Sequence, residues 1–430
     1  MTSVAPVQTE RLVWRSFELD ARPDLIAIGA RSGRFLWQRE DRGLAGAGVA
    51  LRCALPHGLA DRDGVAAVEA ALGAIEAADD HHSGEDSGPS SAGPVAVGAL
   101  PYDRNAPAAL IVPATVVHVA GDRYWCTVIR PAGSDDNVDR AALVASLEAG
   151  ADHRFPPDGF TLSTTIPQGE WRSLIADTVE AIARGPLAKV VLARRVDVEA
   201  NRAFVLPDVL ERLAALYPAC TLFHADGFVG ASPELLIERR GRQLQCLPLA
   251  GTVARSGDIA SDQQLVAGLL SSPKERAEHS FVVDELARAL RPWCEQLEVP
   301  DAPEVLALRN VSHLATRIKG RLPAAGAPSA LGLASLVHPT AAVAGVPRDD
   351  AMAYQRQVEG FDRGPYAGPV GWFDQSGDGS WALGLRCAAI TGARAQLYAG
   401  VGVVAGSDPA AELAETQLKL QAMLAALVRP

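Results

Sequence analysis

The chain of 430 residues lacks the features that mark several large classes of protein. No stretch offers about eighteen uninterrupted apolar residues, the length that a membrane-spanning helix requires. Residues 1–18 contain charged side chains and no apolar core of the length found in a secretory signal. There is no internal repeat, and no glycine-rich phosphate loop ends in Gly-Lys-Ser or Gly-Lys-Thr. These absences predict a cytoplasmic protein that does not cross a membrane.

Positive charge is also in short supply. Lys and Arg total 40 against 51 Asp and Glu, so the formal net charge is −11. A nucleic-acid footprint or an electrostatic membrane anchor needs clustered Lys and Arg, so the charge argues against both partners. A small anionic substrate would therefore need a local basic pocket or a metal ion.

The six cysteines are scattered and show neither CxxC nor metal-ligand spacing. An even count is compatible with disulfides, but in a chain of this size without a secretory signal we expect reduced, mostly buried thiols. The residues are Cys53, Cys126, Cys220, Cys246, Cys294 and Cys387.

Periodicity predicts both strands and helices. Apolar and polar residues alternate over 11–52, which predicts strands with turns at Gly43 and Gly46. Helical spacing covers 65–78 and 171–183, and apolar runs at 189–194, 382–390 and 395–404 read as strands. Residues 79–93, which include His81 and His82, form a polar, Gly/Ser-rich segment that predicts a disordered loop, with a metal-binding His pair as the alternative.

Two pairs of glutamates have the spacing of one helix face. Glu275 and Glu278 are three residues apart, as are Glu412 and Glu415 near the C-terminus. Side chains at this spacing project from the same side of a helix, and carboxylate oxygens are the ligands that Mg²⁺ prefers. Each pair alone is more typical of a solvated helix face, so the metal hypothesis depends on the surrounding motifs.

Three motifs together resemble the chorismate-utilising enzymes, which include isochorismate, anthranilate, aminodeoxychorismate and salicylate synthases. They are Lys-Glu-Arg-Ala-Glu-His at 274–279, Glu-Leu-Ala-Glu-Thr at 412–416 and Gly-Ala-Ser-Pro-Glu at 230–234. The match runs from about residue 189 to the C-terminus. The resemblance implies one α/β (α+β) domain over 1–430, with large antiparallel sheets packed together and helices on the outside. In it, 1–160 is a less specific portion and 161–430 carries the catalytic motifs. The polar segment 132–159 is the alternative, a linker between two domains.

The resemblance assigns a base and an acid. Lys189 would deprotonate the attacking water, although a lysine at a strand end often reaches to solvent instead. Glu234 would protonate the departing C4 hydroxyl of chorismate, although an acid after Ser-Pro can also cap the next segment. Burial raises the pKa of a carboxyl group and lowers that of an amine, as these two roles require.

The remaining roles also come from the resemblance. The metal would be Mg²⁺, bound directly by Glu278 and Glu415 and through water by Glu275 and Glu412, and it would offset the charge of a dianionic substrate. For His313, the alternative to binding substrate is a structural role in the core. The substrate-binding residues would be Gly251, Thr252, His313, Ala342, Tyr366, Arg386, Gly400, Gly402 and Lys419.

Two alanines reduce the number of reactions in this family that the sequence favours. Ala250 stands where aminodeoxychorismate synthases carry a nucleophilic lysine, and Ala342 stands where pyruvate-eliminating members tend to have threonine. The resemblance therefore implies an isochorismate synthase, a Mg²⁺-dependent isomerase (hydroxymutase) that adds water at C2 and removes the C4 hydroxyl. The product would serve siderophore or menaquinone biosynthesis.

The alternatives are a salicylate synthase and, in another class, a non-catalytic acidic protein. Anthranilate synthase is disfavoured by Lys189 and by the lack of a Leu-Leu-Glu-Ser run. A monomer without a glutaminase subunit is expected.

Overall fold

The computed structural model describes residues 11–78, 92–134, 140–149 and 155–428. Most of the expected loop at 79–93, including His81 and His82, lies outside these residues. Within them, no helix is long and apolar enough to cross a membrane. All six cysteines are free thiols, and all but Cys294 are buried.

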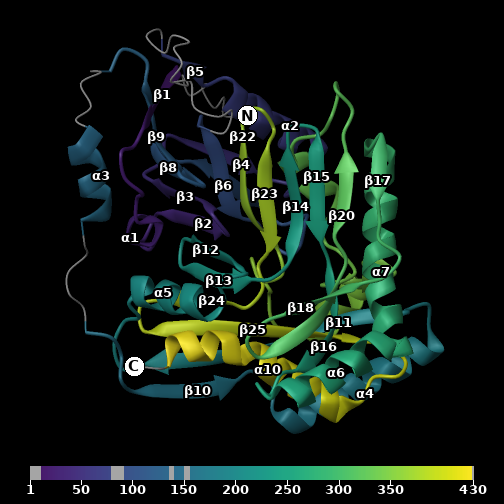
Figure 1. Ribbon diagram of the computed structural model, residues 1–430. Helices are drawn as coiled ribbons and strands as arrows, with labels where there is room; N and C mark the ends of the chain where they lie inside the picture. The colour runs from purple at the N-terminus through teal and green to yellow at the C-terminus, as the bar shows by residue number, and fades with distance from the viewer. Residues whose placement is uncertain (1–10, 79–91, 135–139, 150–154, 429–430) are drawn as a thin grey trace, which may run out of the picture.

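Two large sheets form the framework (Figure 1). Strand pairs are antiparallel throughout the described residues except that β1 and β5 run parallel. The first sheet has the order β10 (Phe160–Thr164), β11 (Lys189–Ala200), β25 (Arg394–Val403), β24 (Cys387–Thr391), β13 (Phe228–Ser232), β12 (Thr221–Ala225), β2 (Phe35–Arg39), β3 (Arg42–Ala47), β8 (Thr115–Ala120), β9 (Arg123–Pro131), β1 (Leu12–Glu18) and β5 (Glu76–Ala77), with β21 (Gly345–Val346) beside β11.

The second sheet packs against the first, and a small third sheet stands beside them. The second has the order β17 (Gln296–Glu298), β20 (Ile318–Arg321), β15 (Gln243–Leu247), β14 (Leu235–Arg240), β23 (Gly379–Leu383), β22 (Pro369–Asp374), β6 (Val95–Ala99), β7 (Ala108–Val112) and β4 (Leu51–Leu55). The third is β16 (Leu249–Ala254), β19 (Val311–Ala315) and β18 (Glu304–Ala307). Aromatic residues join the two large sheets, since Trp37 of β2 meets Trp372 of β22 edge to face at 6.2 Å.

Strands from the two ends of the chain pair directly with each other. In the first sheet β2 pairs with β12, and in the second β6 pairs with β22. Both sheets therefore take strands from before and after the polar segment 132–159, which is not a boundary between the sheets.

The helices lie mainly on the outer surfaces of the sheets. They are α1 (Leu25–Gly29), α2 (Arg62–Gly73), α3 (Arg140–Glu148), α4 (Gln168–Arg184), α5 (Leu206–Leu216), α6 (Ile259–Ser271), α7 (Pro273–Leu290), α8 (Ala330–Val337), α9 (Arg348–Val358) and α10 (Pro409–Leu427). Figure 1 shows α10 lying along β25 at the bottom of the view. Trp171 and Ile175 of α4 pack with Val190 of β11 and Val401 of β25, which confirms the apolar stripe expected over 171–183.

Three details of the sequence prediction are wrong. The helix expected over 65–78 ends at Gly73, and Glu76–Ala77 form β5 instead. Gly43 and Gly46 lie inside β3, and a side chain at Gly46 would come within 2.6 Å of Pro113, so this glycine makes room for packing. The turn instead falls at Glu40, where φ is 55°. The strand expected over 382–390 is divided into β23 and β24 by a turn that ends at Arg386, where φ is 48°.

Candidate active site

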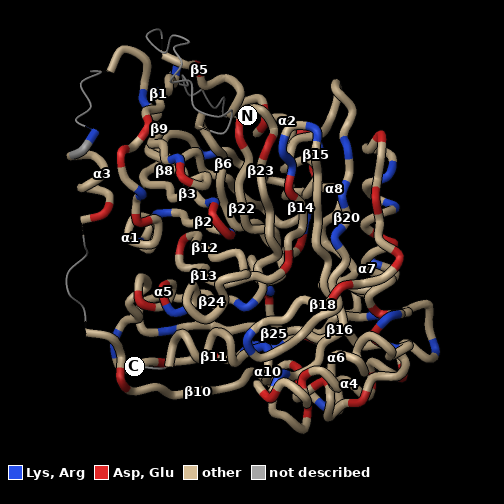
Figure 2. The backbone as a smooth tube through the Cα atoms, viewed as in Figure 1, with Lys and Arg blue, Asp and Glu red and all other residues tan. Residues whose placement is uncertain are grey.

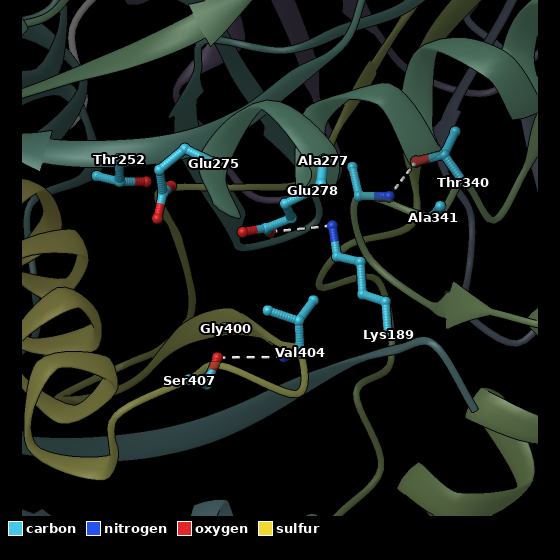
Figure 3. Close-up of polar contacts among 12 residues, drawn as sticks. Lys189, Thr252, Glu275, Ala277, Glu278, Thr340, Ala341, Gly400, Val404 and Ser407 are labelled. Carbon is cyan, nitrogen blue, oxygen red and sulfur yellow. Dashed lines mark hydrogen bonds and ion pairs between the residues drawn. The ribbon is translucent and has the colours of Figure 1, made fainter. Parts of the chain in front are cut away.

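Lys189 is a buried lysine at the first residue of β11. Its side chain is 1% exposed, and Nζ lies 3.0 Å from Oε1 of Glu278 on α7. Figure 3 shows the two side chains pointing toward each other. Lys189 therefore does not reach to solvent; it presents a charge inside the protein.

Gly402 of β25 makes room for this ion pair. Strands β11 and β25 pair in unbroken register, with Val191 opposite Gly402, so the glycine does not mark a bulge. A Cβ at Gly402 would lie 2.2 Å from Oε1 of Glu278 and 2.9 Å from Cε of Lys189. Such distances are far inside van der Waals contact, so this position accepts only glycine without movement of the pair.

Helix α7 begins in a way that directs both of its glutamates toward the site. Ser272 caps the helix by accepting a hydrogen bond from the backbone N–H of Glu275, and Pro273 occupies the first turn. The side chain of Glu275 lies against Gly251, whose φ of +72° suits glycine. Burial, reinforced by the charge of Glu278, raises the pKa of Glu275 to about 7.

Helix α10 supplies the other two carboxylates. Asp408 caps it through the N–H groups of Ala410 and Ala411. Burial and the neighbouring charge of Glu415 raise the pKa of Glu412, against the opposing effect of Lys274 at 3.1 Å.

Glu415 behaves differently from Glu412. Burial favours its neutral form, but the ammonium of Lys419 at 2.6 Å, together with Thr252 and Arg386, outweighs this effect and brings the pKa of Glu415 below its usual value. Lys419 also donates to the carbonyl of Gly400 at 2.9 Å. The two glutamates on α10 thus have pKa values shifted in opposite directions.

The four glutamates fit a hard divalent cation by their chemistry. They are partly or fully buried, they come from two capped helices, and lysine ammonium groups oppose them. In the described part of the chain, no three His, Cys, Asp or Glu side chains already converge as a metal cage. Binding of a metal ion would therefore require these carboxylates to turn away from their lysines.

Glu234 lies between β13 and β14 and is 4% exposed. Burial raises its pKa to about 8, although Lys189, Lys419 and Arg386 act in the opposite direction. The group is consequently protonated at neutral pH, and its role as an acid stays a prediction.

Arg386 and His313 form a buried pair at the other wall. Nη2 of Arg386 lies 3.0 Å from Nε2 of His313, and Nδ1 of His313 lies 3.1 Å from the carbonyl oxygen of Gly251. Burial, with the positive charges of Arg386 and Lys419, moves the pKa of His313 well below its usual value. The neutral histidine therefore lines the site and holds the arginine.

Tyr366 completes this wall. It stacks on Tyr398 with ring centroids 5.0 Å apart, and its hydroxyl would be 2.8 Å from a Cβ placed on Gly400. Burial raises the pKa of Tyr366, so it remains a neutral hydrogen-bonding group.

Ala342 lies in a rigid loop. The loop is fixed by Glu285 of α7, which accepts from the N–H of Ala341 at 2.6 Å and pairs with Arg348 at 2.8 Å. The N–H of Ala342 donates to the hydroxyl of Thr340 at 3.3 Å. Ala342 and Ala250 both present methyl groups to the cavity.

Arg363 is a cavity residue that the sequence analysis missed. It is buried, pairs with Glu359, and donates to the carbonyl groups of Val191 and Val343. The sequence held one signal for it. Arg363 follows Glu359 by four residues, a spacing that predicts an ion pair at a helix end, and it directly precedes Gly-Pro-Tyr-Ala-Gly.

One cavity unites most of the predicted site. The predicted residues that line it are Glu234, Gly251, Thr252, Glu278, His313, Ala342, Tyr366, Arg386, Gly400, Gly402, Glu415 and Lys419. Lys189 reaches it through Glu278, Glu275 lies behind Gly251, and Glu412 lies one helical turn from Glu415. A wider groove of 730 Å³ runs along β15 and β20, but it lacks this convergence of buried ionisable groups.

Together the fold and the cavity define an α/β enzyme with a buried acid, a buried amine and a carboxylate cluster. The family model described as chorismate binding enzyme matches residues 14–428. The chain belongs to this family.

Named relatives fall within the same group. The isochorismate synthase DhbC of Bacillus subtilis (strain 168) is 37% identical over 78% of this chain and 81% of its own length. The salicylate biosynthesis isochorismate synthase of Pseudomonas aeruginosa is 43% identical over 60% of this chain and 54% of its own length. Among solved structures, MenF, the menaquinone-specific isochorismate synthase of Escherichia coli, has a TM-score of 0.78 and 27% identity, covering 97% of this chain and 94% of that one.

Proposed function

We propose that this protein is an isochorismate synthase, an isomerase that converts chorismate reversibly to isochorismate. The observation that carries the proposal is the presence at one site of a buried lysine, Lys189, and a buried carboxyl group, Glu234, which feels the charge of that lysine and has a pKa of about 8. Addition of water at C2 needs a base, and loss of the C4 hydroxyl needs an acid. Relatives named as isochorismate synthases support the same reaction.

Lys189 takes a proton from water in this scheme, and Glu234 gives one to the leaving hydroxyl. Lys189 is paired with Glu278, so its role as a base requires this ion pair to open and its ammonium to give up a proton before it can accept one from water. Glu234 needs no such change, because burial already keeps it protonated.

Mg²⁺ is the proposed cofactor, held directly by Glu278 and Glu415, with Glu275 and Glu412 acting through water. When bound, it would neutralise the carboxylates and polarise the ring carboxylate of the substrate. The raised pKa values of Glu275 and Glu412 support this assignment, because burial and the neighbouring carboxylates both disfavour their charged forms, and a bound cation would offset this cost.

The substrate carboxylates are proposed to bind Arg386, Tyr366 and Lys419 and the backbone around Gly400 and Gly402. Arginine offers a planar fork that matches a carboxylate, and His313 holds this fork in place. With Gly251 and Thr252 these residues close the pocket.

We also propose that residues 1–430 act as one domain and as a monomer, without a glutaminase subunit. The shared sheets support the single domain. Water as the nucleophile makes a source of ammonia unnecessary. The six free thiols favour a reducing compartment, and we propose the cytoplasm.

Chromatography of the products formed from chorismate, with and without Mg²⁺, tests the proposal. Isochorismate alone, formed only with Mg²⁺, is the expected result. Salicylate with pyruvate would instead identify a salicylate synthase, which Ala342 argues against. No conversion would favour a non-catalytic protein and would contradict the proposal.

A further inference from the structure

Lysine is rare in this chain and is concentrated at one place. Of the 40 basic residues counted as Lys or Arg, only four are lysines: Lys189, Lys274, Lys319 and Lys419. Three of the four form ion pairs with the glutamates of the candidate metal site. Lysine differs from arginine in carrying a compact ammonium group, which is small enough to lie between carboxylates where a metal ion could bind.

Two of these lysines already have proposed roles, but Lys274 has none. Its Nζ lies 3.1 Å from Oε1 of Glu412 and 3.9 Å from Oε1 of Glu275, so it bridges α10 and α7. Within the described residues, no other Lys or Arg forms an ion pair with Glu412, whose side chain is 4% exposed.

The place of Lys274 on its helix is unfavourable by itself. It lies in the first turn of α7, where the helix dipole favours acidic residues and disfavours a positive charge. The contacts with Glu412 and Glu275 are what compensate for this position. Because the side chain of Lys274 is 35% exposed, it can also move into solvent.

We propose that Lys274 is a resident cation that neutralises Glu412 and Glu275 in the metal-free protein and competes with the divalent ion for them. It is a positioning residue that weakens metal binding and keeps the ion exchangeable. This inference rests on the metal site of the proposed function. Figure 2 shows the basic and acidic positions interspersed around α6 and α10, where this exchange would occur.

The test is the variant Lys274→Met, which keeps the length of the side chain and removes its charge. After treatment with EDTA, titration calorimetry with Mg²⁺ alone should give a Kd about tenfold lower than that of the wild type, because one nearby positive charge is gone. The melting temperature in EDTA should fall, since Glu412 loses its cation. The rise in melting temperature on adding Mg²⁺ should be larger than in the wild type.

Two control variants separate charge from packing. Lys274→Arg keeps the charge and should not bind Mg²⁺ more tightly than the wild type. Lys319→Met, a substitution on strand β20, should change neither the Kd for Mg²⁺ nor the melting temperature in EDTA.

The possible results distinguish the role of Lys274 from the existence of the metal site. If the ion pair is merely structural, Lys274→Met lowers the melting temperature without binding Mg²⁺ more tightly. If Lys274 preorganises the site, Lys274→Met binds Mg²⁺ more weakly than the wild type. Either outcome overturns the inference. The inference would also be overturned if Lys274→Arg bound Mg²⁺ as tightly as Lys274→Met. No binding of Mg²⁺ by the wild type or Lys274→Met would contradict the metal site itself.

Discussion

The guanidinium of Arg386 determines the tautomer of His313. Arginine can only donate, so Nε2 of His313 must accept from Nη2 of Arg386 at 3.0 Å. The proton therefore resides on Nδ1, which donates to the carbonyl of Gly251 at 3.1 Å. This chain of contacts fixes an arginine at a left-handed backbone position, where φ is 48°.

Replacing His313 should affect binding of the substrate more than its conversion. His313→Leu removes the acceptor that orients Arg386, so we expect KM for chorismate to rise about tenfold while kcat changes by about threefold or less. His313→Gln retains an acceptor oxygen and should recover much of the loss. Steady-state kinetics of both variants provide the test; an unchanged KM in His313→Leu would show that Arg386 needs no such support.

Glu234→Gln should remove the general acid that protonates the leaving hydroxyl. The wild-type rate should fall as pH rises above about 8, because Glu234 then loses its proton. The variant should be slower by about a hundredfold or more. Initial rates between pH 6 and 9.5 measure both effects, and a wild-type rate that stays level through pH 9.5 would exclude Glu234 as the acid.

The same variant should alter the pH dependence of stability. The pKa of Glu234 in the folded protein, about 8, lies above its ordinary value of 4.5. Its contribution to stability is therefore fully present below 4.5 and is lost as pH rises through about 8. Denaturant unfolding should show the wild type losing stability relative to Glu234→Gln across this range, and parallel pH profiles would contradict the burial argument.

Lys189→Met should remove activity while the fold remains. Methionine fills a similar volume but cannot accept a proton from water, so turnover should fall by about a hundredfold or more. Circular dichroism and Mg²⁺ binding should show a folded protein that still binds the ion. Lys319→Met is the matched control and should retain wild-type turnover; full activity of Lys189→Met would refute the base assignment.

Gly402→Ala should disable the site through geometry alone. The new methyl group would lie 2.2 Å from Oε1 of Glu278 and 2.9 Å from Cε of Lys189, so both side chains must leave the positions they hold at the cavity, and turnover should drop sharply. The control is Gly268→Ala in α6, where nothing lies within 4 Å of the added Cβ. That change should retain activity and stabilise the protein by about 0.5–1 kcal/mol. Comparable activity in the two variants would argue against the need for space at Gly402.

Local patterns predicted some elements well and others poorly. The stripe over 171–183 and the apolar run at 395–404 correspond to α4 and β25, because their periodicity matches how each is buried. Gly43 and Gly46 misled because a glycine in a strand and a glycine in a turn look alike in sequence. What distinguishes them is packing by residues distant in the chain, such as Pro113 over Gly46.

The spacing of Glu275 with Glu278 and of Glu412 with Glu415 is a local property of a helix, so the sequence predicts that each pair shares one helix face. The arrangement of charge around these glutamates depends on the tertiary fold, because the lysine partners of Glu278 and Glu412 come from other parts of the chain. Lys189 meets Glu278, and Lys274 meets Glu412 across 138 positions of the chain. Burial then raises the pKa of Glu234 to about 8, a consequence of desolvation that depends on every element packed around it.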